Sequence, residues 1–378
     1  MAKGYATSAD ILTRTRDGQD LNKIWNDYAA ALASFNSARQ PLIDLLSFTV
    51  TNVIEDIITP GSERFEEATE FGIPVSIRPQ PVVTQRAFPF KWYDMRAAYT
   101  FQFLAGGPNA LGGASSQQLD AILQTAMEAD NALQFDLVMK ALFNNVNRSA
   151  GINNVSYTVT ALYNGDGQFI PPYKSATFNP ATHTHYIASA AATLDSTDLT
   201  DLSFMVEEHG YNRQNGYTTI LMVNKTESDV IKTFRRGVVN NNAQTAVYDF
   251  IPAQGIGFQL PVGWEVAAGS QPSATFANMS VVGAYGNILV VEDPQIPSGY
   301  MVAAASAGRS SNLNIVGLRE PEQPGLKGLV LRPGNNANYP LIDSFFVRGL
   351  GSGVAQRGAS AIMKITAGAY TVPTGFVW

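Results

Sequence analysis

The sequence predicts an α+β fold organised around one long helix. Three observations predict it: helical periodicity over residues 115–145, a proline-containing extended stretch before it, and alternating helix and strand signals after it. At 1.5 Å per residue the helix would be roughly 45 Å long, too long for one small core to enclose. We therefore expect a frame made by the helix and the extended stretch, and a separate mixed α/β domain.

The long helix is predicted by its apolar stripe and by its N-terminal signals. Ser115 or Ser116 can cap the start, and Gln118 stands in capping-box position relative to Ser115. Asp136 and Lys140 are spaced as a favourable i,i+4 pair. Apolar residues recur at steps of three and four, at Leu119, Ile122, Ala126, Leu133, Leu137 and Ala141.

Composition narrows the class of protein. The chain has 378 residues, of which 45% are hydrophobic and 15% charged, so it is long enough for two globular domains. A net charge of −6 argues against a strongly basic nucleic-acid binder, but not against a protein that surrounds nucleic acid. The absence of cysteine excludes disulfides, thiol nucleophiles and cysteine metal sites. Because there is neither a secretory signal nor a long apolar run, we expect a protein that works in a cytoplasm.

Residues 1–57 are predicted to form an arm that packs on something larger. Residues 21–35 keep helical spacing of apolar side chains, and Pro41 ends that helix. Residues 42–58 are apolar without a clean period, so they do not indicate a compact domain of their own.

Residues 63–103 are predicted to form an extended hairpin. Its first limb is dense in charge, and its return limb alternates from Val82 to Trp92 so that aromatic residues share one face. An isolated two-stranded hairpin is marginal in water, and the chain offers these aromatics no evident local surface. We therefore predict that they contact a neighbouring copy. The predicted intersubunit contacts are Glu63, Arg64, Glu66, Glu67, Arg78, Arg86, Phe88, Phe90 and Trp92.

Residues 196–317 alternate between helix and strand signals and predict the mixed α/β domain. A helix begins at Asp195 or Ser196 and ends at Gly210. A strand covers 217–223, a helix capped by Thr226 ends near Gly237, and another strand covers 288–291. Near the C-terminus, two further strands, 345–348 and 354–365, are predicted around a turn at Gly349, Gly351 and Gly353.

Few residues indicate chemistry. His183 and His185 would share a strand face, and Glu208 could complete a metal site, but two exposed histidines are the more economical interpretation. His209 beside Gly210 is interpreted as a partner of a helix C-terminus. The glycines near 350 fail the dinucleotide spacing, and there is neither a phosphate loop nor a G-x-S-x-G motif. We therefore predict no enzyme and assign no catalytic, cofactor-binding or metal residue.

The order of these elements resembles the major capsid proteins of tailed bacteriophages, with the Hong Kong 97-type (HK97-like) fold. The stretches that carry the resemblance are 63–103, 119–143, 288–303 and 345–365. It implies an N-terminal arm (1–57) and an extended loop (58–104). A peripheral β-sheet domain would comprise 105–195 with the spine helix 115–145, together with 318–358, and an axial domain would comprise 196–317 and 359–378.

The resemblance implies a structural function. Copies of the chain would form hexamers and pentamers of an icosahedral shell around double-stranded DNA, without sequence-specific binding. Implied partners are a portal and separate scaffolding or decoration proteins, with no membrane. The protein would reside in the virion capsid and assemble in the bacterial host cytoplasm.

Two departures and two alternatives accompany the resemblance. Some relatives cross-link through a loop-tip lysine, but residues 69–87 contain none, so no cross-link is expected. Only about 57 residues precede the loop, so we expect a separate scaffolding protein or none. An encapsulin-like nanocompartment with protein cargo remains open, as does an oligomeric metal-dependent enzyme using His183, His185 and Glu208.

Overall fold

The computed structural model describes two compact units. The first comprises Met1–Gln40, Phe90–Leu137 and Arg319–Gly351, and the second comprises Pro41–Pro89, Val138–Leu318 and Ser352–Trp378. The described residues are 28% helical and 31% strand, which confirms the α+β class. Within these units the described residues are 14–37, 40–59, 83–97, 113–152, 155–174, 176–253, 275–276, 279–332, 334 and 344–378.

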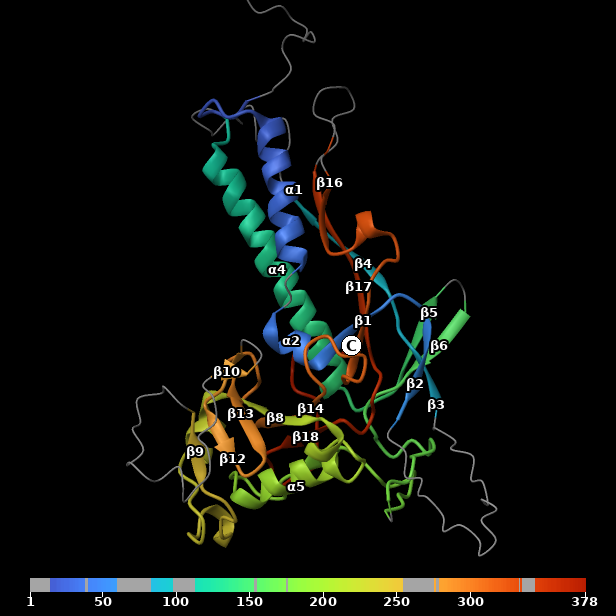
Figure 1. The fold of residues 1–378 in the computed structure, drawn as a ribbon, viewed down its shortest axis with the longest axis vertical. Helices are drawn as coiled ribbons and strands as arrows, with labels where there is room; N and C mark the ends of the chain where they lie inside the picture. The colour runs from blue at the N-terminus through green and yellow to red at the C-terminus, as the bar shows by residue number, and fades with distance from the viewer. Residues whose placement is uncertain are drawn as a thin grey trace, which may run out of the picture. The chain divides into compact units, whose positions relative to one another are not determined.

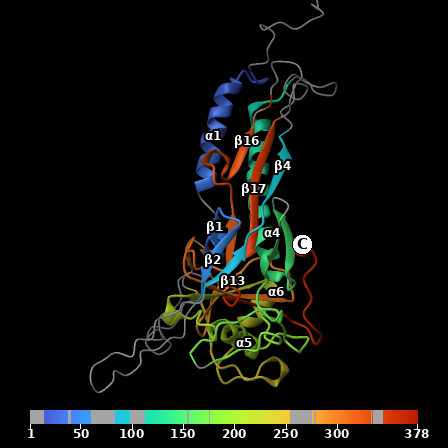
Figure 2. The same cartoon turned by 90° about the vertical axis from the view of Figure 1, so that its right-hand side faces the viewer.

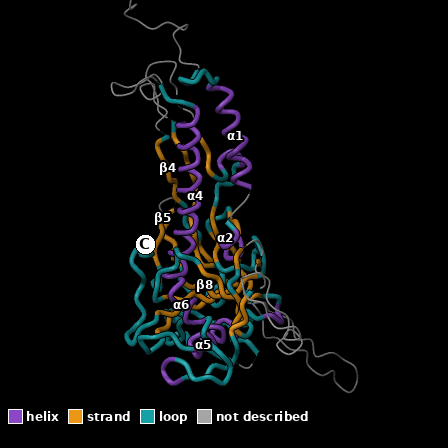
Figure 3. Tube along the Cα trace, turned by 90° about the vertical axis from the view of Figure 1, so that its left-hand side faces the viewer, coloured by secondary structure: helices purple, strands orange, loops and turns teal. Residues whose placement is uncertain are grey.

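In the first unit, α1 (Leu21–Ser37) lies along the long helix α4 (Ser116–Phe143), as Figures 1 and 3 show. The Tyr28 hydroxyl donates a hydrogen bond to Asp120, 2.7 Å away. The shared core includes Leu21, Ile24, Tyr28, Leu32, Leu119, Leu123 and Ala126. The N-terminal arm therefore packs on the helix that the sequence predicts, through the apolar stripe of each.

The predicted capping box of α4 is present. The Ser115 backbone N–H donates to Gln118 Oε1 at 3.0 Å, and the Gln118 N–H donates to Ser115 Oγ at 3.4 Å. Asp17 adds a tertiary contact, because its carboxylate accepts from the Ser116 N–H at 3.0 Å. These bonds satisfy donors that a helix start leaves without intrahelical partners.

The first unit also contains three strands of a five-stranded sheet, and these three pair antiparallel (Figure 2). The strand β17 (Phe345–Val354) pairs on one side with β4 (Lys91–Arg96) and on the other with β16 (Leu329–Arg332). In this register Arg348 stands opposite both Tyr93 and Leu329.

The predicted glycine turn is wrong. Gly349, Gly351 and Gly353 lie inside the continuous strand β17, and the next strand, β18, is Ser360–Lys364. At Gly349 a Cβ atom would come within 2.6 Å of the Phe90 ring and 2.8 Å of the Trp92 ring. Glycine is needed there because aromatic side chains lie over the strand, and not because the chain turns.

The second unit is built on a seven-stranded mixed sheet. Parallel pairs join β13 to β8 and β18 to β7, and the other neighbours are antiparallel. β14 is buried along its whole length, as expected for a strand covered on both faces. The strand order is β7 (Tyr186–Ala188), β18, β14 (Tyr300–Ser306), β8 (Thr218–Val223), β13 (Ile288–Glu292), β12 (Gly283–Tyr285) and β9 (Phe250–Pro252).

Helices pack on this sheet. α5 (Ser196–Glu207) lies against β18 and β14, and Asp195 and Asp198 form its capping box, so the predicted start is confirmed. α2 (Pro41–Leu46) also packs against β14. The prediction for α6 was partly wrong: it covers Lys225–Ile231, its cap is Asn224 instead of Thr226, and it ends before Gly237.

The remaining strands lie outside the seven-stranded sheet. β1 (Ser47–Val50) is the neighbour of β15 (Val316–Arg319) in the five-stranded sheet, and β5 (Arg148–Ile152) pairs with β6 (Val155–Val159). β2 (Ile54–Ile58) pairs with β3 (Val83–Ala87), and β10 (Thr275–Phe276) pairs with β11 (Met279–Ser280). In the described part of the chain, no helix combines the length and the apolar character needed to cross a membrane. Single 3₁₀ turns are η2 (Arg213–Asn215), η3 (Asn241–Ala243) and η4 (Pro324–Leu326).

Candidate functional site

The predicted intersubunit residues divide into two groups. The residues of the charged limb and tip, Glu63, Arg64, Glu66, Glu67 and Arg78, lie outside the described residues. Four residues of the return limb are described: Arg86, Phe88, Phe90 and Trp92. They do not form one strand face, because β3 ends at Ala87 and β4 begins at Lys91.

Phe88 is buried by its own chain. Its side chain is fully inaccessible and belongs to a small core with Phe48, Val50 and Ile57. Gly317 and Gly353 admit the ring, since a Cβ at either position would press on it. The expectation that the chain offers these aromatics no local surface is therefore wrong for Phe88. Phe48, Val50 and Ile57 precede it by about 30–40 residues, whereas Gly317 and Gly353 follow it by more than two hundred.

Arg86 is also buried within the chain. Its guanidinium donates to Gln168 Oε1 at 3.5 Å, and its Nε has no hydrogen-bond partner among the described residues. Burial, followed by the charge of Arg357, lowers the pKa of Arg86. These contacts indicate an internal role for Arg86.

Trp92 remains a candidate contact residue. Its side chain is 49% exposed on β4, and its ring meets Phe90 edge to face at 5.2 Å between centroids. Phe90 is half-buried and carries the Arg319 guanidinium over its ring at 5.6 Å. The Phe90 ring therefore packs against the Trp92 indole, and the exposed part of the indole presents a large apolar surface.

One face of the β2–β3 ribbon carries exposed apolar side chains that the sequence analysis did not single out, with the exposed pair Asp56 and Gln85 between them. Ile58 stands directly opposite Val83, and both side chains are about half exposed. Ile54, four residues before Ile58 and therefore on the same strand face, is exposed as well. The opposite face is covered, with Ile57 and Arg86 buried. The signal that could have identified it is the pair of isoleucines at 54 and 58, which share a strand face by period two. We call Ile54, Ile58 and Val83 the ribbon patch.

A second exposed apolar group lies in the seven-stranded unit, on the segment between α6 and β9. An isolated bridge joins Val239 to Thr245, and Ala246 donates its N–H to the Val238 carbonyl. These bonds hold a tight loop whose large side chains point to solvent. The loop patch consists of Val238, Val239, Val247 and Tyr248.

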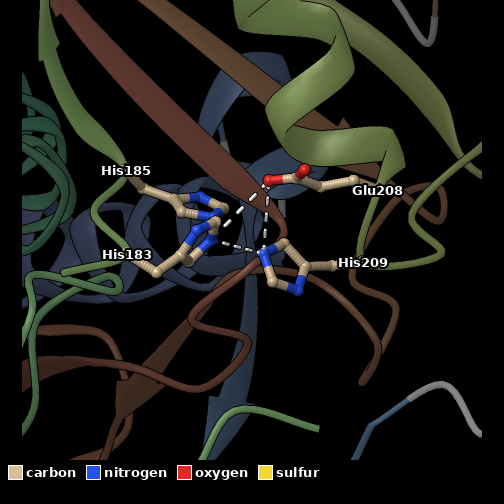
Figure 4. Close-up of side chains that lie close together, drawn as sticks. All are labelled: His183, His185, Glu208 and His209. Carbon is tan, nitrogen blue, oxygen red and sulfur yellow. Dashed lines mark hydrogen bonds and ion pairs between the residues drawn. The ribbon is translucent and has the colours of Figure 1, made fainter. Parts of the chain in front are cut away.

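The three histidines are brought together (Figure 4). Figure 4 shows His183 and His185 side by side, with their rings turned toward His209 and the Glu208 carboxylate. His183 Nε2 lies 3.2 Å from His185 Nε2 and 2.9 Å from His209 Nε2. Glu208 Oε1 lies 3.6 Å from His183 Nε2 and 3.8 Å from His209 Nε2.

This arrangement corrects the sequence-based interpretation of the histidines. His185 is fully buried and not exposed, and His209 is 5% exposed and faces the other two rings. His183 and His185 come from the segment that enters β7, whereas Glu208 and His209 follow α5. We call these four residues the histidine cluster. One ligand atom from each lies within 4.8 Å of every other.

The surroundings of the cluster favour neutral imidazoles. Burial lowers the pKa of His185 to about 3 and, together with the neighbouring histidines, that of His209 to about 2. Burial also lowers the pKa of His183 and raises that of Glu208. The histidines therefore offer lone pairs at neutral pH, which is the form that ligates metals.

Comparisons with known proteins identify the family. No family model and no curated protein matches the chain. A chain from the structure of Mycobacterium phage Patience is 42% identical, with 100% of this chain and 97% of that chain aligned and a TM-score of 0.71. The capsid of an empty GTA particle is 10% identical over 87% of this chain and 91% of that chain, with a TM-score of 0.42. The holo-SrpI encapsulin complex from Synechococcus elongatus PCC 7942 is 12% identical over 88% and 89%, with a TM-score of 0.40.

The identification rests on the phage chain, because its identity and coverage include every element described above. The long helix, the β2–β3 ribbon and the mixed sheet belong to one continuous match. The chain is therefore a member of the Hong Kong 97-type family of tailed-bacteriophage major capsid proteins.

Proposed function

We propose that copies of this chain assemble as hexamers and pentamers into an icosahedral shell that encloses double-stranded DNA. The full-length match at 42% identity carries this proposal. The net charge of −6 suits a container that holds DNA without sequence-specific binding and releases it later. The chain acts as a structural protein and not as an enzyme.

The ribbon patch is the surface that we assign to contact with a neighbouring copy. Exposed isoleucine and valine side chains on a two-stranded ribbon are costly in water, and a second copy of the chain would cover them. The residues that connect β2 to β3 in sequence, 59–82, belong to the extended loop (58–104) that we expect to lie across the same neighbour. Trp92 is a further contact on the first unit.

Residues 196–317 and 359–378 would form the axial domain, where copies meet around the capsomer axis. The loop patch gives this domain an apolar surface of its own. Partners would be a portal and separate scaffolding or decoration proteins, and the finished shell would reside in the virion after assembly in the host cytoplasm. No lysine in 69–87 is available for a loop-tip cross-link.

The main test is assembly of ribbon-patch variants. Ile58→Asp and Val83→Asp should abolish shells, since a desolvated aspartate at an apolar contact costs several kcal/mol. The isosteric control Val83→Thr should reduce assembly less. Negative-stain microscopy counts shells, and sedimentation with circular dichroism shows whether the variants remain folded capsomers or monomers.

Two outcomes would contradict the proposal. A wild-type chain that stays a 40.7 kDa monomer would exclude shell formation, and folded aspartate variants that assemble normally would exclude the ribbon patch as a contact. The contents of the particles distinguish a phage capsid from an encapsulin-like compartment. Nuclease-protected DNA in particles from infected cells supports the capsid. An enclosed enzyme without DNA supports the compartment.

A further inference from the structure

The histidine cluster gathers every histidine of the chain. The sequence contains three histidines, and all three meet at Glu208 (Figure 4). We propose that His183, His185, His209 and Glu208 form a tetrahedral zinc site that fastens the segment entering β7 to the C-terminal end of α5. This inference is independent of shell assembly, because all four ligands come from one chain and one compact unit.

The ligand spacing fits a small divalent cation. Four atoms placed 2.0–2.1 Å from a tetrahedral zinc lie about 3.3 Å from one another. Four of the six separations in the cluster, 2.9, 3.2, 3.6 and 3.8 Å, scatter around that value, and all six lie within 4.8 Å. Small rotations of the side chains would equalise them.

The assignment of protons to the imidazole nitrogens also favours a cation. His185 Nδ1 lies 2.7 Å from the Ser360 carbonyl oxygen, which can only accept, so Nδ1 carries the proton and Nε2 offers a lone pair. His183 Nε2 lies near both His185 Nε2 and His209 Nε2. One proton on His183 would have to serve two lone pairs at once. A cation at the centre accepts all three lone pairs and removes this conflict.

The protein surrounds the cluster as it would a metal centre. The Ser360 carbonyl orients His185, a contact of the type that fixes ligand tautomers around metals. The Phe178 ring lies 4.1 Å from His209 and the Tyr163 ring 5.4 Å from His185, measured between centroids. Gly358 leaves room for His209, because a Cβ there would lie 3.0 Å from that ring.

The donor set selects the metal and its role. Three imidazoles and one carboxylate suit zinc, whereas magnesium and calcium prefer oxygen ligands. Four protein ligands fill a tetrahedron, so the site is structural and leaves no position for a substrate. The side chains of His183 and Glu208 are 15% and 16% exposed, which provides an entry path for the ion.

The test uses untagged full-length protein, because an affinity tag of histidines would bind zinc itself. After chelator dialysis and re-equilibration with zinc, elemental analysis should find about one zinc per chain. Cobalt should give the visible absorption of a tetrahedral site. Glu208→Gln and His183→Gln, both at partly exposed positions, should weaken zinc binding by at least the roughly 10–100-fold that loss of an outer partner of a ligand costs. Zinc, and not magnesium, should raise the thermal unfolding midpoint of the wild type.

Glu207→Gln is the matched control. Glu207 is the adjacent acid and accepts from Ser203 at 3.1 Å outside the cluster, so this variant should bind zinc like the wild type. Two results would overturn the proposal: a wild-type chain that takes up no zinc, or folded Glu208→Gln and His183→Gln variants that bind it as tightly as the control.

Discussion

Arg348 in the first unit and Arg357 in the second are both buried, at 5% and 2% exposure, but only one is fully hydrogen-bonded. Arg348 forms ion pairs with Glu320 at 2.9 Å and Asp130 at 3.5 Å. Its Nε and the facing Asp130 Oδ1 have no hydrogen-bond partner among the described residues. Openings of about 100 and 150 Å³ adjoin it on either side.

Arg357 has a partner for every nitrogen. Its Nε donates to the Ala161 carbonyl at 2.8 Å, and its Nη2 donates to the Leu162 carbonyl at 3.1 Å. Its Nη1 donates to Gln168 Oε1 at 3.1 Å, and its Nη2 also donates to Asp166 Oδ2 at 2.8 Å. Because two acceptors are backbone carbonyls, Arg357 holds the path of the chain itself. Among the described residues, the Arg348 side chain is paired with the carboxylates of Glu320 and Asp130, and both of these can be replaced together with it.

The largest effect that no compensating substitution should restore is expected at Arg357. Arg357→Met should destabilise the chain by roughly 3–5 kcal/mol, because Asp166 and two buried carbonyls lose their donors. Urea unfolding followed by circular dichroism measures the change. Arg235→Met, at an exposed position, is the control and should change stability by about 0.5 kcal/mol or less. A loss of stability below about 1 kcal/mol in Arg357→Met would contradict the claim that its hydrogen bonds hold the path of the chain.

At Arg348 the effect should depend on whether its partners are removed as well. Arg348→Ala alone should cost roughly 3–5 kcal/mol, because it removes the buried cation that Asp130 and Glu320 share. The triple variant Asp130→Leu, Glu320→Leu, Arg348→Met should recover most of that loss, as apolar replacement of a whole buried ion group often does. The same urea experiment compares them. If the triple variant is as unstable as Arg348→Ala, apolar side chains cannot replace the group of Arg348, Asp130 and Glu320. The two buried arginines would then not differ as we expect.

The smallest effect is a difference in pH dependence. Burial, opposed by Arg348 and Gln134, raises the pKa of Asp130 above its ordinary value of 3.8. The folded state then binds more protons than the unfolded state, so the contribution of Asp130 to stability is present at low pH and is lost as pH rises through the raised pKa. For Asp166, burial is outweighed by hydrogen bonds from Arg357 and Asn147, and its pKa is lowered. Its contribution is present above pH 3.8 and is lost as pH falls through the lowered pKa.

Asn substitutions measure these opposite signs. For each variant we subtract its unfolding free energy from that of the wild type. As pH rises from acid toward neutral, this difference should fall for Asp130→Asn and rise for Asp166→Asn. Neither slope can exceed about 1.4 kcal/mol per pH unit for a single group. Equal signs for the two differences would show that the two carboxylates occupy equivalent surroundings.

Local patterns were sufficient for much of the fold. The long helix, its capping box at Ser115 and Gln118, the start of α5 at Asp195 and the strand β8 all depend on residues close in sequence. Periodicity and capping act over three or four residues, so a single sequence expresses them directly. The family resemblance followed from the order of such elements.

The functional surfaces depended on distant residues and could not be predicted in the same way. Period two indicated that Arg86, Phe88 and Trp92 share a face, but could not show that Gly317 and Gly353 admit the Phe88 ring while Trp92 stays exposed. The glycines of β17 suggested a turn, and the sequence could not correct this because the rings that cover Gly349, Phe90 and Trp92, lie more than 250 residues earlier.

The sequence by itself determined the helical frame around residues 115–145, the α+β class and the absence of cysteine chemistry. Only the tertiary structure decided which aromatic residue remains available to a neighbour, and that His183, His185 and His209 meet at Glu208. The physical reason is range: helix periods and caps are local, whereas burial and ligand geometry are set by segments that pack together only in the folded chain.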